Sequence, residues 1–329
     1  MGGSKYMSGR YNPYTNFRET YADIIRKSRG LPKTVKTTAF IESLISEAMQ
    51  TSMSQSLEAG ILIDEDDYVA NHCRVYFPAD SNLLHMLWKA KMDVTLSDIA
   101  EFPRAFTIAW PDDIEIEGQK LCGCLVWWGT AKERRELNTR FGNKYLNGNF
   151  LPWNPKTPLR DDQRILSISY HQTDPTMGGE IMAYRCVVPD EKLALCLKSP
   201  EEMKSAIGEL GALMTLSLTD EERKQQFIML KLALHLMVYA TACPQAILPG
   251  WPDKYREHDV SKGWMKDFTP IRLASPIRHR EGSSPETHWR NWHFRQYPIK
   301  KDGSRQKGLV FVTGCLVNAD VDPQTVIEM

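Results

Sequence analysis

The alternation of apolar and polar positions predicts strands in the middle of the chain. Four stretches are rich in β-branched and aromatic residues, and three of them are followed directly by proline or glycine, as is typical of strands. They are residues 106–110, 121–128, 165–170 and 181–188. Short turns, one of them at Gly178 and Gly179, indicate antiparallel pairing. Trp127 and Trp128 lie on opposite faces of their strand, so we expect one to fill the core and the other to meet a helix or a partner.

Helical periodicity occurs on both sides of these strands. Apolar residues recur at helical spacing in three short segments. They are residues 17–28, 38–60 and 83–91. A fourth helix begins after Thr219, which with Glu222 fits a capping box, and its apolar residues cover most of its circumference. This pattern predicts a buried helix near 220–242, in which His235 is expected to be an ordinary core residue.

Four consecutive acidic residues, Asp64 to Asp67, stand apart from these patterns. Carboxylates in a row could bind a metal ion, but the spacing of a calcium loop and its glycine are both missing. We therefore expect a solvated helix start or loop here. Residues 132–145 are also charged, and the segment 147–158 that follows is rich in Asn and Pro, which indicates a loop.

Together these elements predict an α+β fold. We expect an antiparallel sheet with packed helices, the buried helix near 220–242 and a C-terminal β-hairpin that adds to the sheet or its edge. We expect three regions in the chain of 329 residues. Residues 1–36 are a basic N-terminal arm, 37–250 an α+β core, and 251–329 a basic C-terminal region whose hairpin completes the core.

Charge distinguishes the two ends from the middle of the chain. Basic and acidic residues balance at 41 each, so the net charge predicts neither nucleic acid nor membrane as a partner. Residues 1–36 contain eight Lys or Arg against two acids, and residues 251–310 contain thirteen against seven. Each segment therefore has an excess of six positive charges, which leaves an acidic body between basic ends.

Cysteine usage and hydropathy indicate a reducing cytosol. Seven cysteines are scattered through apolar segments, as expected for reduced structural thiols. Cys122 and Cys124 are too close for a zinc site, and we expect no metal and no cofactor. The chain has neither an apolar N-terminal segment nor a run of apolar residues that could span a membrane.

The stretch from His288 to Tyr297 carries the candidate chemistry. It combines histidine, arginine and aromatic residues, continues through a basic turn and enters the apolar run 309–312, which predicts a hairpin. We expect a binding surface that includes both faces of the strand and the turn. Its residues are His288, Arg290, Trp292, His293, Arg295, Tyr297, Lys300, Lys301 and Arg305.

Several functions are compatible with this composition. Basic and aromatic residues could contact phosphates and stack on bases, or they could form the hot spots of a protein interface. They could also simply pack a sheet edge. Catalysis is disfavoured, because histidines five apart lie on opposite faces of a strand and no hydrolase, Walker or Rossmann motif occurs. We therefore expect no enzyme.

Three segments resemble a type V-A anti-CRISPR family that suppresses production of the CRISPR effector nuclease. The C-terminal motif is His288, Arg290, His293 and Tyr297 before a strand that ends at residues 316–318. The segments 102–128 and 227–244 resemble the family's earlier strands and its Leu-rich helix. The chain differs from the family at Asn291, at Phe294, and at Trp292, where the family tends to have glycine.

The resemblance implies a phage or mobile-element protein that acts in the cytoplasm of the bacterial host cell without catalysis of its own. Its partner would be the CRISPR effector nuclease, met as the nascent polypeptide, or the translating ribosome and message, with RNA as a further contact and no membrane. The protein would lower expression of the effector through translation-coupled mRNA decay. A phage or plasmid regulatory protein that binds RNA or DNA is the alternative, and a metal-dependent nuclease is the third.

Overall fold

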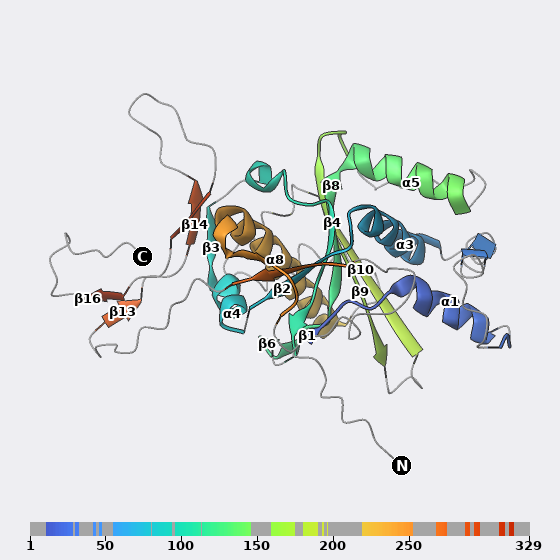
Figure 1. The fold of residues 1–329 in the computed structure, drawn as a ribbon, viewed down its shortest axis with the longest axis horizontal. Coiled ribbons are helices and arrows are strands. Elements are labelled where there is room, and N and C mark those ends of the chain that lie inside the picture. Colours follow the sequence, from blue (N-terminus) through green and yellow to red (C-terminus); the bar gives the residue numbers. More distant parts are fainter. Residues whose placement is uncertain are drawn as a thin grey trace, which may run out of the picture.

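A mixed seven-stranded sheet forms the centre of the computed structural model (Figure 1). Its order is β10 (Glu180–Pro189), β9 (Arg164–Asp174), β8 (Cys124–Thr130), β4 (Ala105–Ile108), β2 (Arg74–Pro78), β12 (Thr269–Leu273) and β11 (Ile247–Pro249). The first four strands pair antiparallel, as do β12 and β11, whereas β2 runs parallel to both of its neighbours. The expected antiparallel hairpins are therefore present, joined by a parallel segment.

The structure describes only part of the chain. The described residues are 11–28, 30–32, 42–43, 46–47, 55–79, 81–93, 96–112, 114–145, 159–174, 180–189, 193, 196, 219–252, 268–274, 287–289, 293–296, 309–312 and 316–318. Among these, no helix has the length and apolar character needed to cross a membrane.

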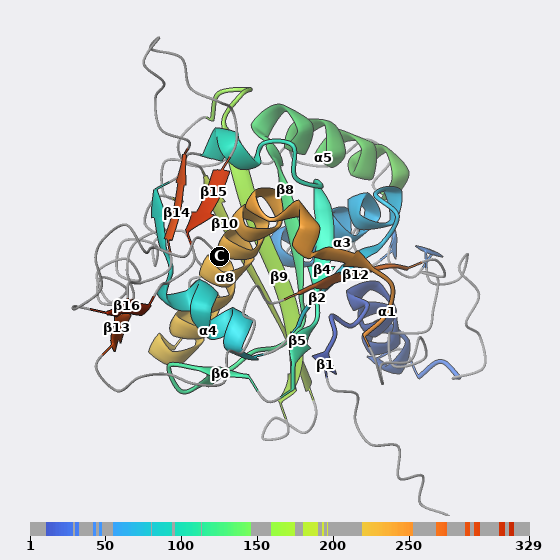
Figure 2. The ribbon, with the colours of Figure 1, turned by 60° about the vertical axis from the view of Figure 1, so that its left-hand side comes forward.

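Two helical layers cover the sheet from opposite sides (Figure 2). On one side are α8 (Asp220–Ala242) and α4 (Ser81–Lys89), whose apolar residues form one core with Trp128. On the other side, α1 (Phe17–Ser28), α3 (Gln55–Ala70) and α5 (Ala131–Tyr145) surround Trp127. The two neighbouring tryptophans therefore fill two separate cores, as their alternation along the strand predicts.

The buried helix predicted near 220–242 is α8. Thr219 and Glu222 form the predicted capping box, with Glu222 N donating to Thr219 Oγ1 at 3.2 Å and Thr219 N to Glu222 Oε2 at 2.7 Å. His235 is fully buried, and its Nδ1 lies 2.6 Å from the carbonyl oxygen of Leu87. Burial, and after it the charge of Lys231, lowers the pKa of His235 to about 3, so this histidine is neutral and structural.

The N-terminal residues that the structure describes pack onto the body. The helix predicted at 17–28 is α1, and β1 (Tyr11–Asn12) pairs antiparallel with β5 (Trp110–Pro111). Gly123 allows this approach, because a Cβ there would collide with the backbone of Pro13 and Tyr14. Residues 11–28 are therefore integral to the fold, and the division of the chain at residues 36 and 250 stays a prediction.

The remaining strands are short. β6 (Glu115–Ile116) pairs with β7 (Gln119–Lys120). A separate three-stranded sheet has the order β15 (Leu309–Val312), β14 (His293–Gln296), β3 (Lys91–Asp93), and β13 (Thr287–Trp289) pairs with β16 (Leu316–Asn318). Within the described residues, the 3₁₀ helices η1 (Leu96–Ile99) and η4 (Pro244–Ala246) connect longer elements. Of the helix predicted at 38–60, most of residues 38–54 lie outside the described part of the chain.

Candidate functional site

The predicted C-terminal hairpin is confirmed. β14 and β15 pair antiparallel, with His293 opposite Val312. Farther from the turn, β13 and β16 pair in the same sense, with Trp289 opposite Leu316. Three residues separate the two ladders on each strand, so both ladders share one register. The two pairs of strands therefore follow the register of a single hairpin.

The hairpin does not extend the seven-stranded sheet, so the expectation that it adds to that sheet or its edge is wrong. β14 instead runs parallel to β3, beside α8 (Figure 1). The physical reason is that the edge of β14 away from β15 pairs with β3, which belongs to a separate three-stranded sheet. β11 forms one edge of the seven-stranded sheet, and β10 forms the other.

The structure places three of the predicted site residues. His288 lies in β13, and His293 and Arg295 lie in β14, where their spacing of two puts them on one face of the strand. The other predicted residues are outside the described part of the chain; they are Arg290, Trp292, Tyr297, Lys300, Lys301 and Arg305.

Two residues that the sequence analysis missed stand at register positions beside this surface. Lys91 is opposite His293 and Asp93 is opposite Arg295 in the parallel β3–β14 pair. A parallel pairing across two hundred residues leaves no local pattern in the sequence, so no signal could have identified it. We call His288, His293 and Arg295, with Lys91 and Asp93, the hairpin surface.

The acidic residues Asp64 to Asp67 lie within α3, and the expectation of a solvated helix start or loop is wrong. Asp64, Glu65 and Asp67 are at most 1% exposed. Each carboxylate is matched by donors from other elements, which offsets the loss of hydration. Asp64 pairs with Arg134 and Asp66 with Arg18, while Asp67 accepts from Arg104 at 2.7 and 2.8 Å and from Trp127 Nε1 at 3.0 Å.

Glu65 caps the first turn of α1 from the neighbouring helix. Its carboxylate accepts hydrogen bonds from the backbone N–H of Phe17 at 2.6 Å, from that of Arg18 at 3.0 Å and from the hydroxyl of Tyr14 at 2.8 Å. These are donors that the start of a helix otherwise leaves unsatisfied. Burial raises the pKa of Glu65 to about 7, against the lowering effect of Arg18.

The same charge cluster fixes α5 on the sheet. The helix begins with a capping box, in which Thr130 N donates to Glu133 Oε2 at 2.7 Å and Glu133 N to Thr130 Oγ1 at 3.2 Å. Its inner face is buried and includes Arg134, whose guanidinium pairs with Asp64 and stacks over Trp127 at 5.1 Å from the ring centroid. The orientation of α5 about its axis is therefore set from within.

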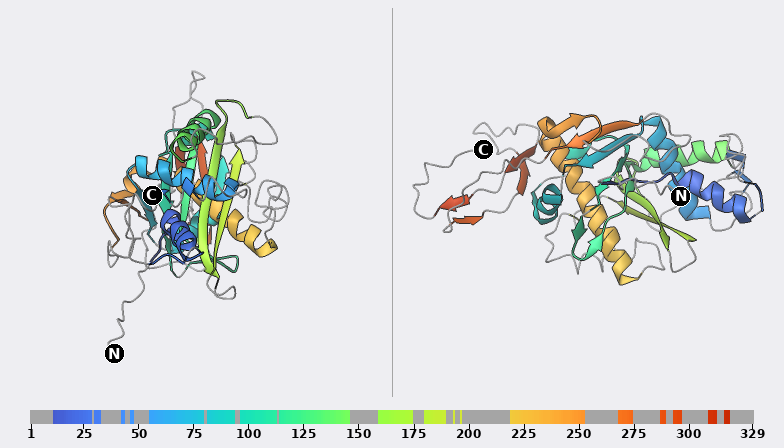
Figure 3. Two further views of the ribbon diagram at one scale, coloured as in Figure 1. Left: turned by 90° about the vertical axis from the view of Figure 1, so that its right-hand side faces the viewer. Right: turned by 60° about the horizontal axis from the view of Figure 1, so that its bottom comes forward.

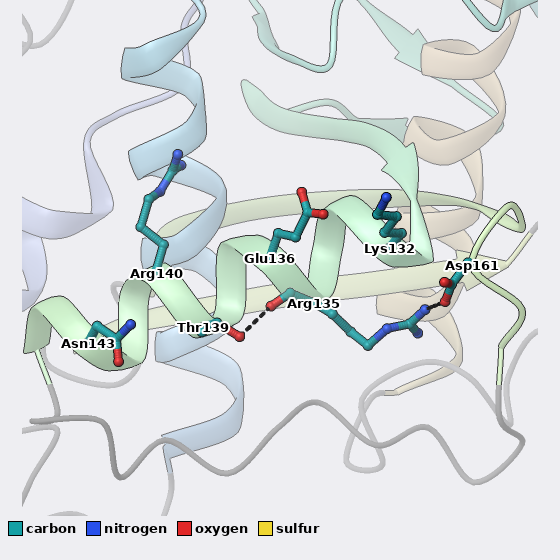
Figure 4. Close-up of a pocket in the computed structure, with 7 residues that line it drawn as sticks. All are labelled: Lys132, Arg135, Glu136, Thr139, Arg140, Asn143 and Asp161. Carbon is teal, nitrogen blue, oxygen red and sulfur yellow. Dashed lines mark hydrogen bonds and ion pairs between the residues drawn. The ribbon is translucent and has the colours of Figure 1, made fainter.

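The outer face of α5 borders a broad, open hollow of about 550 Å³ (Figure 4). The hollow is lined by Lys132, Arg135, Glu136, Thr139, Arg140, Asn143 and Asp161. Arg135 forms an ion pair with Asp161, and Thr139 Oγ1 donates to the Arg135 carbonyl at 3.0 Å. Within the described residues, no group of three His, Cys, Asp or Glu is arranged to hold a metal ion.

Comparison with known proteins connects the hairpin to a family. A family model described as "Anti-CRISPR type V subtype A2 family" matches residues 77–319, which is well over half of the chain. The match begins after α1 and α3 and includes α4, the central sheet, α8 and the hairpin strands. No curated protein and no solved structure matches the chain.

Proposed function

The chain belongs to the anti-CRISPR type V subtype A2 family, and on this premise we propose that it recognises a nascent CRISPR effector polypeptide or its translation complex. It is an anti-CRISPR protein, and its partners lie in the CRISPR system. In the proposed mechanism, recognition in the cytosol of the bacterial host lowers effector expression through decay of the message. The chain itself contributes binding and no catalysis.

The observation that carries this proposal is that the family match includes the hairpin surface. The hairpin is held by β3 and lies beside α8, separate from the strand order of the main sheet. His293 and Arg295 therefore occupy a strand that is supported on both sides, and rigid strands position recognition residues better than loops do. Histidine and arginine can donate to the carbonyl and carboxylate groups of an extended peptide.

The experiment expresses the protein beside several CRISPR systems and measures effector message and effector protein. We expect both to fall in at least one system. The variant His288→Ala/Arg290→Ala/His293→Ala should restore them, because it removes three of the residues predicted to bind the partner. A matched control, His85→Ala/Lys89→Ala, changes exposed residues of α4 and should leave repression intact. Unchanged effector levels in every system would contradict the proposal.

A second measurement tests the absence of catalysis. Pure protein is incubated with effector message, with and without divalent cations. We expect intact RNA in both conditions. Cleavage that requires a divalent cation and disappears in the triple variant would replace the proposal with a metal-dependent nuclease.

A further inference from the structure

The outer face of α5 carries cations in a regular arrangement. Lys132, Arg140 and Lys144 recur at intervals of four or eight residues, which aligns them along one stripe of the helix. Arg140 and Lys144 are 58% and 50% exposed at their side chains, and Lys132 is exposed as well. Figure 4 shows Lys132 and Arg140 on the same side of the helix.

The protein compensates the cations of this stripe to different degrees. Arg140 lies 3.7 Å from Asp67 and Lys144 lies 3.6 Å from Asp66. Both carboxylates have closer inner partners, Arg104 at 2.7 Å for Asp67 and Arg18 at 2.5 Å for Asp66. The inner arginines Arg18 and Arg104 are shared with Glu42 and Glu133, so both carboxylates also interact with Arg140 and Lys144. Lys132 makes no ion pair with any residue that the structure describes. The charge of Lys132 therefore remains available to a ligand, and Arg140 and Lys144 present side chains that are at least half exposed beside it.

The residue types that line the hollow beside the stripe indicate which class of ligand it could bind. The lining of the hollow consists of basic, acidic, hydroxyl and amide side chains, and it includes no apolar or aromatic residue. A protein interface would need an apolar or aromatic anchor, and a site for unpaired bases would need stacking rings. Lysine, arginine, threonine and asparagine are instead the types that contact phosphate and sugar.

An acidic residue within the stripe favours RNA over DNA as the ligand. Glu136 lies between Lys132 and Arg140 at spacings of four and makes no ion pair among the described residues. A carboxylate repels phosphates, but it accepts a hydrogen bond from a ribose 2′-hydroxyl, which DNA lacks. Thr139 Oγ1 already donates to Arg135, so its oxygen also remains as an acceptor.

We propose that the outer face of α5 is an RNA-binding surface. Lys132, Arg140 and Lys144 contact backbone phosphates, and Glu136 accepts from a 2′-hydroxyl. The ligand is paired RNA recognised by its backbone, because the hollow offers no aromatic ring on which an unpaired base could stack. This surface is distinct from the hairpin surface and does not depend on the function proposed for it.

The experiment measures fluorescence anisotropy of a labelled RNA hairpin, and of a DNA hairpin of the same sequence, with the full-length protein. We expect RNA affinity to fall steeply with salt. The variant Lys132→Gln/Arg140→Gln/Lys144→Gln should lower the salt slope by roughly three, about one for each phosphate contact, and weaken binding more than tenfold at low salt. Gln keeps a polar side chain without the positive charge, and it places no negative charge near Asp66 or Asp67.

The matched control, Lys27→Gln/Lys89→Gln/Lys120→Gln, removes the same charge from other exposed positions and should bind RNA as the wild type does. Failure of the wild type to bind RNA at low salt, or equal losses in both triple variants, would overturn the proposal. If the triple variant does not fold, Lys132→Gln alone serves as the test, because Lys132 is exposed and makes no ion pair in the described structure.

Glu136→Gln separates RNA recognition from simple attraction between charges. Removing a negative charge should strengthen binding to the DNA hairpin more than binding to the RNA hairpin, so the ratio of RNA to DNA affinity should fall. An unchanged ratio, or wild-type binding of DNA that equals its binding of RNA, would overturn the choice of RNA as the ligand. These measurements need no CRISPR component, so their outcome is independent of the repression experiment.

Discussion

Arg134 shows how strongly the interior depends on matched charges. Its guanidinium is buried between α5 and α3 and pairs with Asp64, which also accepts from Ser167 Oγ at 3.1 Å. At the next position of the same helix, Arg135 pairs with Asp161 at the surface, with side chains 39% and 75% exposed. The two arginines therefore differ in burial while sharing a helix and a type of partner.

We expect Arg134→Met to lower the free energy of unfolding by about 3–5 kcal/mol, because it leaves Asp64 buried without its cation. Arg135→Met, the matched control, should change it by less than about 1 kcal/mol, because water screens an exposed ion pair. Urea denaturation measures both values. Similar losses in the two variants would contradict the assignment of Arg134 to the buried cluster.

Glu65 should make stability depend on pH. Its pKa rises from the ordinary value of 4.5 to about 7 in the folded protein. The stability contributed by its protonated form is complete below pH 4.5 and is lost as the pH rises through 7. The free energy of unfolding should therefore fall across this window by up to about 1.4 kcal/mol per pH unit more in the wild type than in Glu65→Gln. Equal slopes in denaturation series at pH 5, 6, 7 and 8 would contradict this.

At the scale of elements, local patterns predicted what depends on near neighbours. The ends of α1, the capping box of α8 and the strands around Trp127 and Trp128 follow from spacing, caps and β propensity within a few residues. The burial of Asp64 and Asp67 does not follow from local patterns. Their partners, Arg134 and Arg104, are 70 and 37 residues away in the chain. An isolated run of acids looks solvated until its partners are known.

The capping box at Thr130 and Glu133 was a local signal that the sequence analysis did not use. It marks the start of α5 in a stretch described only as charged. The candidate hairpin surface was predicted in part, since the hairpin itself follows from composition. The pairing of the hairpin with β3 was not predicted, because parallel strands that lie far apart in the chain have no sequence signature of their own.

β1 offers a test of close packing between elements. Gly123→Ala should push the Pro13–Tyr14 backbone away from the sheet, because the added Cβ would collide with it. We expect faster limited proteolysis within residues 11–28 and a lower thermal midpoint. In the control Gly30→Ala, no atom lies within 4 Å of the added Cβ, so only the strain of its positive φ of 64° acts. Equal proteolysis of both variants would contradict the contact.

β3 should be necessary for the hairpin surface to function. Met92→Pro removes a backbone donor and fixes φ, which a strand paired with β14 tolerates poorly. We expect repression of the effector to be lost in this variant and kept in Met92→Leu, the matched control. Thermal denaturation separates a local effect from global unfolding. Full repression by a folded Met92→Pro variant would show that β3 is dispensable.

At the scale of the whole molecule, the hairpin and α5 lie at opposite ends (Figure 3). The central sheet and its two cores separate them, with α8 on the hairpin side and α3 with α5 on the other. The family match includes both α5 and the hairpin, but not α1 or α3. The proposed arrangement is thus one end that recognises the effector polypeptide and another that holds RNA.

The most direct test of the central proposal compares two recoded effector messages in cells that express the protein. One message is recoded with synonymous codons, so its RNA changes while the polypeptide stays the same. The other carries compensating frameshifts across the first coding segment, so the polypeptide changes while most of the RNA stays the same. We predict repression of the first message and escape of the second. Repression of the frameshifted message, or escape of the synonymous one, would contradict recognition of the nascent polypeptide.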